Sequence, residues 1–266
     1  MDLNLVLDTA AQAALAAGRA ILEIRSSGFG VRYKADSSPV TAADFRSDSI
    51  IGAALAAAYP DIPHLTEETR DDGSRLTSRY CFIVDPLDGT KEFVRGSEEF
   101  TVNIALAEDG VPVVGVIYVP CADTLYFAVR GGGAFRLEQA ASHPLADAAA
   151  IHAAADTEHL TLVTGHTGAA QICAAFGDAV TVKPVGSALK GCLVAEGSAH
   201  LCVCPHPTHE WDTAAMQCIL TEAGALLRLY DGSEPRCNRA DTVNHDGFYL
   251  LNRAENAWVI DKLLGT

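Results

Sequence analysis

The sequence is short of basic residues. Its 266 residues include 19 lysines and arginines against 34 aspartates and glutamates, which gives a formal net charge of −15. A protein that binds duplex nucleic acid needs a basic face to displace the counterions of the phosphates, so this composition argues against that class. The acidity does not exclude a small phosphorylated ligand, because bound cations can supply the missing positive charge.

Long apolar runs are also missing. No stretch approaches the roughly 18 uninterrupted apolar residues of a membrane-spanning helix, so we expect no integral membrane segment. Residues 1–25 resemble a secretory signal in length, but they lack a basic start and carry Asp2 and Asp8 instead. Their apolar residues recur at helical spacing, which predicts an amphipathic first helix over residues 1–24. We expect a cytoplasmic protein, with a peripheral position at the inner membrane face as the alternative.

None of the eight cysteines forms a CxxC pair. Most lie inside apolar runs, which predicts reduced, buried thiols in a cytosolic protein. Cys202 and Cys204 have the wrong spacing for a zinc knuckle, and their alternation around Val203 is typical of a strand. His206 and His209 follow closely, so a small Cys/His metal site is the alternative.

The length of 266 residues suits one large domain or two small ones, and the 49% of hydrophobic residues excludes a disordered chain. The first half combines helices with strands that pair through hairpin turns, Asp109-Gly110 being the clearest turn. The second half alternates helices and strands, as layered α/β proteins do. We place an α+β half at residues 1–143 and an α/β half at 144–266. The predicted helices cover residues 1–24, 39–58 (opened by Pro39), 167–176, 187–196, 210–223 and 255–264. The predicted strands cover residues 62–66, 81–84, 100–107, 111–119, 125–130, 133–137, 160–164, 180–184, 201–204, 225–229 and 247–251, and residues 31–35 are predicted to be extended.

Three acidic clusters follow apolar runs or open a helix. They are Glu67-Glu68, the run from Asp85 to Thr90, and Glu210-Trp211-Asp212. In the second cluster a buried strand ends at Asp85, Pro86 restricts the backbone, and Gly89 allows a tight turn that brings Asp88 to the same side. Carboxylates and a backbone carbonyl between them are the oxygen ligands that magnesium prefers. Without a cation such carboxylates would repel each other and raise each other's pKa.

Each cluster also has a purely structural explanation. The second can be an Asp-Gly turn whose Asp88 or Thr90 caps a short helix. Adjacent acids such as Glu67 and Glu68 commonly lie on a solvated face, and an acid such as Asp212 is favoured near a helix start. The joint occurrence of all three clusters favours the metal site.

At these residues the sequence resembles the inositol monophosphatase superfamily of magnesium-dependent, lithium-sensitive phosphatases. The family has a Glu-Glu pair, an Asp-Pro-(Ile/Leu)-Asp-Gly-Thr run and a later Trp-Asp-x-Ala in this order, and the resemblance covers nearly the whole chain. It implies a mixed α+β and α/β fold, a layered αβαβα sandwich of the sugar-phosphatase type. It also implies a cofactor of two or three Mg²⁺ ions.

Further motifs are similar to the CysQ-type 3'(2'),5'-bisphosphate nucleotidases of that superfamily. They are Tyr33-Lys34-Ala35-Asp36, Ser38 to Asp44, Lys91-Glu92-Phe93, Glu99 to Leu106 and Gly186 to Gly197. This similarity implies hydrolysis of the 3'-phosphate of adenosine 3',5'-bisphosphate to AMP and phosphate. One departure concerns the substrate: Cys204 stands where that branch carries an arginine, and His206 or His209 is a candidate replacement.

The resemblance also implies roles for individual residues. Glu67, Asp85 and the Leu87 carbonyl would hold one Mg²⁺, Asp85, Asp88 and Asp212 a second, and Glu68 would support a third through water. Asp44 would accept a hydrogen bond from the Thr90 hydroxyl, and the pair would orient the attacking water. The remaining expected contacts to substrate come from Lys34, Gly89, Thr90, Ser187, Lys190 and Asp212.

Other functions stay open. A phosphatase of the same superfamily could act on inositol monophosphate, histidinol phosphate or a sugar bisphosphate. A protein that binds metal or nucleotide without catalysis is the alternative from another class. The sequence does not distinguish a monomer from a homodimer.

Overall fold

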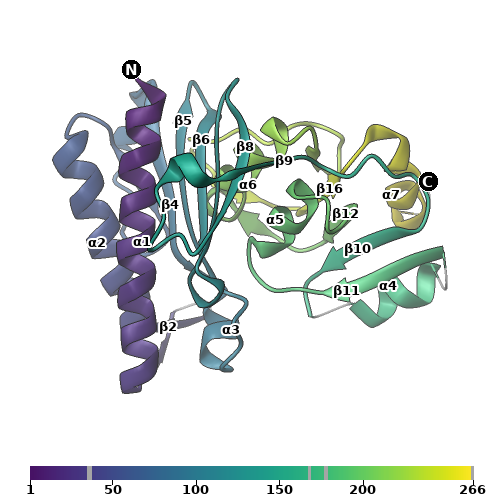
Figure 1. Cartoon of the computed structure of the whole chain (residues 1–266), viewed down its shortest axis with the longest axis horizontal. Coiled ribbons are helices and arrows are strands. Elements are labelled where there is room, and N and C mark those ends of the chain that lie inside the picture. Colours follow the sequence, from purple (N-terminus) through teal and green to yellow (C-terminus); the bar gives the residue numbers. More distant parts are fainter. Residues whose placement is uncertain (35–37, 167–168, 177–178, 265–266) are drawn as a thin grey trace.

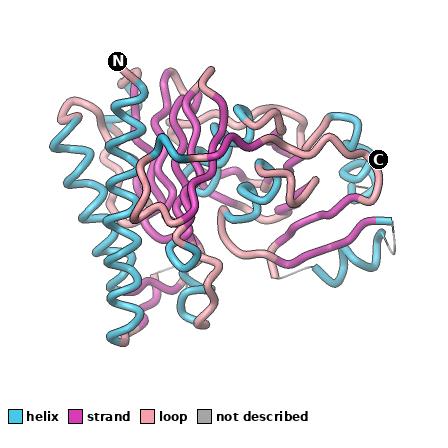
Figure 2. The backbone as a smooth tube through the Cα atoms, in the orientation of Figure 1, coloured by secondary structure: helices cyan, strands magenta, loops and turns pink. Residues whose placement is uncertain are grey.

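Two large β-sheets, with helices between them and on both outer sides, make up the fold (Figures 1 and 2). The computed structural model describes residues 1–34, 38–166, 169–176 and 179–264. The first half contains α1 (Leu3–Ser27), β1 (Val31–Tyr33), β2 (Pro39–Thr41), α2 (Ala42–Ala58), β3 (His64–Thr66), β4 (Tyr80–Asp88), α3 (Thr90–Val94), β5 (Thr101–Glu108), β6 (Val111–Val119), β7 (Thr124–Val129), β8 (Gly133–Glu138) and β9 (Ala149–Ile151). The second half contains β10 (Leu160–Thr164), α4 (Ala169–Phe176), β11 (Val180–Pro184), α5 (Leu189–Ala195), β12 (Leu201–Cys204), β13 (Thr208–His209), α6 (Glu210–Glu222), β14 (Leu226–Leu229), β15 (Val243–Asn244), β16 (Phe248–Leu251) and α7 (Trp258–Leu264).

The first sheet has the strand order β3-β4-β5-β6-β7-β8-β9 and is buried on both faces. Side chains alternate between the faces of a strand. In β5, Val102, Ile104 and Leu106 join the core beneath α1 and α2, whereas Ala105 and Ala107 join the core on the opposite side. Because both faces are covered, the strands are almost continuously apolar although most pairs are antiparallel.

The second sheet has the order β11-β10-β12-β16-β14. β10 runs parallel to β11 and β12, and β16 pairs antiparallel with β12 and β14. Helices α5 and α6 lie between the two sheets, and α4 and α7 pack on the far side of the second one (Figure 1). Successive layers are therefore helices, sheet, helices, sheet and helices, and the predicted αβαβα sandwich is confirmed.

Helix α6 lies directly on the first sheet, and a glycine makes this close approach possible. A Cβ atom on Gly115 of β6 would collide with the carbonyl oxygen of Ala215 in α6 and lie 2.9 Å from the Cβ atom of Cys218. The absence of a side chain at Gly115 thus lets α6 approach the strands that carry the acidic residues. This packing brings Asp212, in the first turn of α6, to the end of β4.

Helix α1 is long and apolar enough to cross a membrane if length and composition alone are considered. Over half of its most apolar window is buried, and its buried face packs against α2, β5 and β6. In this structure α1 is thus a core helix, the amphipathic helix predicted from its spacing of apolar residues.

The largest differences from the expected elements concern the second helix, the strand that leads to Asp85 and the last helix. Pro39 does not open the second helix: it pairs with Tyr33 in the β1–β2 hairpin, and the helix begins after Thr41, whose hydroxyl accepts a hydrogen bond from the Ala43 amide. A proline at the first residue of a short strand removes no needed ladder hydrogen bond. The strand predicted to end at Val84 continues to Asp88. The last helix begins at Trp258 after a 3₁₀ turn.

Some expectations fall at the limits of the described chain. Ala35 and Asp36, and the first two residues of the helix predicted from 167, lie outside the described residues. The change from the first sheet to the second falls between β9 and β10. The domain division at residues 143 and 144 stays a prediction. All eight cysteines are free thiols, and five of them are buried.

Candidate active site

A β-bulge at the end of β4 brings two aspartates to one place. The strand pairs with β5 as far as Asp85, opposite Asn103, and resumes at Asp88, opposite Thr101. The two residues between them, one of which is Pro86, interrupt the ladder. A bulge suits proline, which has no backbone N–H to donate. The bulge therefore explains why the strand continues past the predicted end and why both carboxylates face one site.

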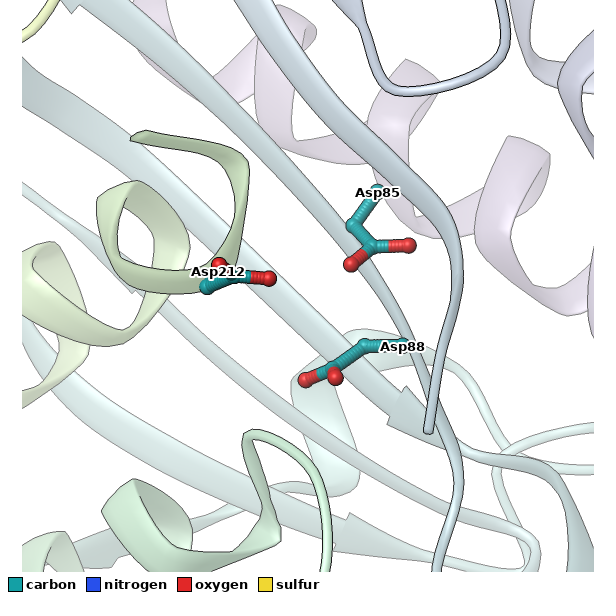
Figure 3. Close-up of side chains that lie close together, drawn as sticks. All are labelled: Asp85, Asp88 and Asp212. Carbon is teal, nitrogen blue, oxygen red and sulfur yellow. The ribbon is translucent and has the colours of Figure 1, made fainter. Parts of the chain in front are cut away.

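Asp212 completes the cluster from α6. One carboxylate oxygen from each of Asp85, Asp88 and Asp212 lies within 4.8 Å of the other two, and the three carboxylates point toward one another (Figure 3). Within the described residues this is the one such group of three or more acidic, histidine or cysteine side chains. The alternative Cys/His metal site around Cys204 and His206 is therefore not found there.

The charges in this cluster are poorly compensated by the protein itself. Burial raises the pKa of Asp85 well above its usual value, and the charges of Glu67, Asp88 and Asp212 raise it further. Burial and the charge of Asp88 raise the pKa of Asp212 to about 8. Burial also raises the pKa of Asp88, although Lys190 opposes this effect. Carboxylates in this situation are neutralised either by protons or by a bound cation.

Hydrogen bonds from both halves of the chain hold these aspartates. Asp88 accepts from the side-chain amide of Asn103 (3.2 Å) and from the backbone N–H of Ala188 (2.6 Å). Asp212 accepts from the N–H of His209, as part of the capping box of α6. The site is thus assembled across the boundary between the two sheets.

The Glu67-Glu68 pair lies next to the cluster, at the end of β3. The Lys34 ammonium lies 2.7 Å from Glu67 and 2.6 Å from Glu68. Burial lowers the pKa of Lys34, but the hydrogen bonds to these two carboxylates outweigh it and raise the pKa above its usual value. Despite the hydrogen bond from Lys34, burial raises the pKa of Glu68 to about 7. Lys34 is thus a partial counter-charge for the edge of the cluster.

Thr90 and Asp44 form a hydrogen-bonded pair beside the carboxylates. The Thr90 hydroxyl donates to Asp44 Oδ1 (2.9 Å), and the N–H and hydroxyl of Thr41 both donate to Asp44 Oδ2 (2.7 Å each). Asp44 is 1% exposed, so its carboxylate is fixed on both oxygens. Gly89, with a φ of +90°, makes the turn that places Thr90 at the start of α3.

Two cavities meet at the cluster and share Asp88, Gly89, Glu92 and Asp212. One, of about 240 Å³, is lined by the metal-type ligands and Thr90. The other, of about 230 Å³, continues into the second half. A larger cavity of about 800 Å³ between β8, β9 and Glu196 contains none of the three clustered aspartates. The arrangement of acids rather than cavity size therefore identifies the candidate active site.

The second cavity contains most of the residues expected to contact substrate. Ser187 and Lys190 line it, and the Lys190 ammonium donates to the Ser187 carbonyl (2.6 Å). Cys204 lines the same wall. Among the residues that the structure describes, neither His206 nor His209 lines this cavity: His206 is exposed, and His209 stacks on Trp211 with ring centroids 4.3 Å apart. The suggested replacement of the arginine by one of these histidines is therefore not seen.

Sequence reasoning missed an interaction next to this cavity, between neighbours of Gly165 and Gly186, which line it. His166 Nε2 lies 2.6 Å from Glu99 Oε2, which also accepts from the N–H of Gly186 (3.0 Å). Gly165, beside His166, lines the cavity. The available signal was the position of His166 just after β10, since ligands of α/β proteins gather at the carboxyl ends of strands.

Comparisons with known proteins agree with this geometry. Residues 2–263 match the family model of the inositol monophosphatase family. The chain belongs to the inositol monophosphatase family. The predicted superfamily and the prediction of an enzyme are thereby confirmed, and the family is metal-dependent.

The 3'(2'),5'-bisphosphate nucleotidase CysQ of Shigella flexneri is 38% identical over 256 residues, covering 91% of this chain and 98% of that protein. The crystal structure of CysQ from Bacteroides thetaiotaomicron has 35% sequence identity and a TM-score of 0.79, covering 93% and 97% of the two chains. A histidinol-phosphatase of Mycobacterium tuberculosis is 36% identical over 203 residues, 75% of this chain and 77% of that protein. Relatives named for different substrates are thus similar in sequence to this chain.

Proposed function

We propose that this protein is a magnesium-dependent phosphomonoesterase that hydrolyses the 3'-phosphate of adenosine 3',5'-bisphosphate to AMP and phosphate. The observation that carries the proposal is the cluster of Asp85, Asp88 and Asp212 beside the Thr90–Asp44 pair, at the meeting point of two cavities. The similarity to nucleotidases over nearly the whole chain supports the choice of substrate.

The donor set suits magnesium because it is made of oxygen atoms alone. Glu67, Asp85 and the Leu87 carbonyl would hold one ion, and Asp85, Asp88 and Asp212 a second. Glu68 would support a third ion through water. Bound Mg²⁺ would neutralise the phosphate oxygens and lower the pKa of a water molecule. The raised pKa values of the aspartates fit this role, since a cation relieves the repulsion that raises them.

The Thr90–Asp44 pair would orient the attacking water. The Thr90 hydroxyl donates to Asp44 Oδ1 at 2.9 Å, nearer than its other acceptor, the Leu87 carbonyl at 3.2 Å. The Thr90 oxygen would then keep its lone pairs free to accept a hydrogen bond from water. Because Thr41 fixes the other Asp44 oxygen, the direction of this acceptor is set before substrate binds. Positioning of this kind is most of what phosphoryl transfer requires from protein side chains.

The second cavity would hold the rest of the substrate. Lys190 is a basic residue that lines this cavity. The hydrogen bond from the Lys190 ammonium to the Ser187 carbonyl places the ammonium next to Asp88. Gly89 and Thr90 would receive the scissile phosphate in the first cavity, and His166 follows Gly165, which lines the second. Lys34 would contact the substrate once a metal ion replaces it as the partner of Glu67.

Cys204 supports a second candidate, a phosphatase for a monophosphate such as histidinol phosphate. A thiol at this wall supplies no positive charge for a second phosphate. The 36% identity to a histidinol-phosphatase makes this the alternative to test first.

The test is phosphate release in the presence of Mg²⁺ from adenosine 3',5'-bisphosphate, inositol 1-phosphate, fructose 1,6-bisphosphate and histidinol phosphate. The highest kcat/KM on the adenosine bisphosphate would support the proposal and show that Cys204 does not spoil recognition. The highest kcat/KM on a monophosphate would contradict it. Li⁺ should inhibit at concentrations at which Na⁺ does not, and size-exclusion chromatography would distinguish a monomer from a homodimer.

A further inference from the structure

One face of helix α2 contacts three separate parts of the candidate active site. Asp44, Ser47 and Asp48 stand at positions i, i+3 and i+4, so their side chains share one side of the helix. Asp44 binds the Thr90 hydroxyl, as described above. The other two side chains have no role in the proposed reaction, yet each binds a segment that carries metal-type ligands.

Ser47 holds the bulge of β4. Its hydroxyl donates to the Pro86 carbonyl at 2.6 Å, and Ser47 is 0% exposed. Pro86 lies between Asp85 and Leu87, at the place where the ladder with β5 is interrupted. Since a bulge leaves backbone groups without ladder partners, the Ser47 hydroxyl supplies the hydrogen bond that this carbonyl lacks. The orientation of the peptide between the two predicted ligands therefore depends on Ser47.

Asp48 holds the segment that carries Glu67 and Glu68. Its Oδ1 atom accepts from the Thr66 hydroxyl at 2.5 Å, and its Oδ2 atom accepts from the Thr69 hydroxyl at 2.9 Å. These two threonines flank the glutamate pair directly. The Asp48 carboxylate thus fixes both ends of the short segment from which the glutamates project.

We propose that Ser47 and Asp48 are positioning residues that set the separation of Glu67 from Asp85 and so tune the affinity for the divalent cation. This inference rests on the proposed role of these carboxylates as metal ligands. The helix is a rigid element, and the spacing of Ser47 and Asp48 along it fixes where the Pro86 carbonyl and the Thr66–Thr69 segment lie relative to each other. Groups that orient metal ligands commonly change metal affinity by roughly 10- to 100-fold when they are removed.

The experiment is isothermal titration of the full-length protein with Mg²⁺ in the absence of substrate, for the wild type, Ser47→Ala and Asp48→Ala. The matched control is Ser49→Ala, the same substitution at an exposed position of the same helix. We expect the Kd for Mg²⁺ to rise by about 10-fold or more in the two test variants and to stay at the wild-type value in the control. Thermal unfolding in EDTA is measured in parallel. A lower Tm with an unchanged Kd would mean that Ser47 and Asp48 stabilise the fold without affecting metal binding, and this result would overturn the proposal.

Thr66→Val gives a second route if Ser47→Ala or Asp48→Ala does not fold. This substitution removes the hydrogen bond between Thr66 and Asp48 by changing the donor rather than the acceptor, and it keeps the shape of the side chain. Its Kd should rise as in Asp48→Ala, and the double variant Thr66→Val/Asp48→Ala should lose less affinity than the two single effects combined, because both substitutions remove one and the same interaction. Additive effects, or wild-type affinity in Thr66→Val, would overturn the role of Asp48.

Metal binding without substrate also separates this inference from the proposed function. A wild-type protein that binds Mg²⁺ but releases no phosphate from any substrate would overturn the proposed function alone. A wild-type protein that binds no Mg²⁺ would overturn both.

Discussion

The two ends of the β4–β5 strand pair carry acidic residues in opposite electrostatic states. At one end Glu108, paired in register with Tyr80, accepts hydrogen bonds from the Tyr80 hydroxyl and from Arg79 and Arg130. These partners lower the pKa of Glu108 from 4.5 to about 2. At the other end, roughly 17 Å along β4 at about 3.3 Å per residue, burial and like charges raise the pKa of Asp85.

The difference separates a part of the molecule that contributes to stability from a part that contributes to function. The Glu108 end has its charges matched by arginines and needs no ligand. The Asp85 end has more carboxylates than the basic side chains around it neutralise, so a bound cation would stabilise it. A buried acidic cluster with more carboxylates than basic partners is a candidate functional site for this reason.

The largest effect on activity is expected at the Asp85 end of the strand pair. Asp88→Asn removes a predicted ligand of the second ion and should lower kcat by more than about 1,000-fold, because the metal contributes several kcal/mol to the transition state. The Tm in EDTA should not fall, since the substitution also removes a repelling charge. Steady-state kinetics and thermal unfolding check both points. Asp61→Asn, at an exposed position after α2, is the control. Substantial activity in Asp88→Asn would contradict the assignment of the ligands.

Thr90→Val should lower kcat by about 100- to 10,000-fold, the range usual for proton-handling groups, with a smaller change in KM. The hydroxyl that orients water is lost, while the carboxylate cluster is left in place. Thr90→Ser keeps the hydroxyl and should recover most of the activity, and Thr77→Val is the exposed control. Equal kinetics in Thr90→Val and the wild type would exclude Thr90 from the reaction.

The two ends should respond to pH in opposite directions. Asp212 has its pKa raised from 3.8 to about 8, so its protonated form stabilises the folded state at low pH. In EDTA this contribution is lost as the pH rises from about 4 through about 8, because the folded state must then ionise against its neighbours. Saturating Mg²⁺ should remove the loss. Thermal unfolding across this pH range, with EDTA or with Mg²⁺, tests the expectation, and parallel curves in the two conditions would contradict it.

The smallest effect is expected from Glu108→Gln, at the end of the strand pair where arginines balance the acidic charge. Glu108 has a lowered pKa, so its contribution to stability is present above about pH 4.5 and is lost as the pH falls toward about 2. The variant should show a slightly lower Tm at pH 7 and a flatter dependence of Tm on pH below 4.5. Its kcat should stay within about twofold of the wild type, because distant sites act independently. A large loss of activity would mean that the two ends are coupled.

Much of the architecture could be predicted from local patterns. The turn at Asp109-Gly110, both residues of which adopt positive φ, lies where the sequence placed a hairpin. The order of strands and helices in the second half also follows the prediction closely. Pro39 and the end of β4 were misjudged because a proline can begin a strand as well as a helix, and because the alternation of a strand says nothing about a bulge.

The types and order of the acidic residues are properties of the sequence itself. Asp85 and Asp88 are close along the chain, so their common location follows from a strand end and a tight turn. The approach of Asp212 could not be derived in this way, because it depends on α6 lying against β6 where Gly115 leaves room. The pairing of Lys34 with Glu67 and the contact between His166 and Glu99 likewise join segments far apart in sequence. Local periodicity determines which elements form, whereas packing between them decides which distant side chains meet and therefore which charges remain unmatched.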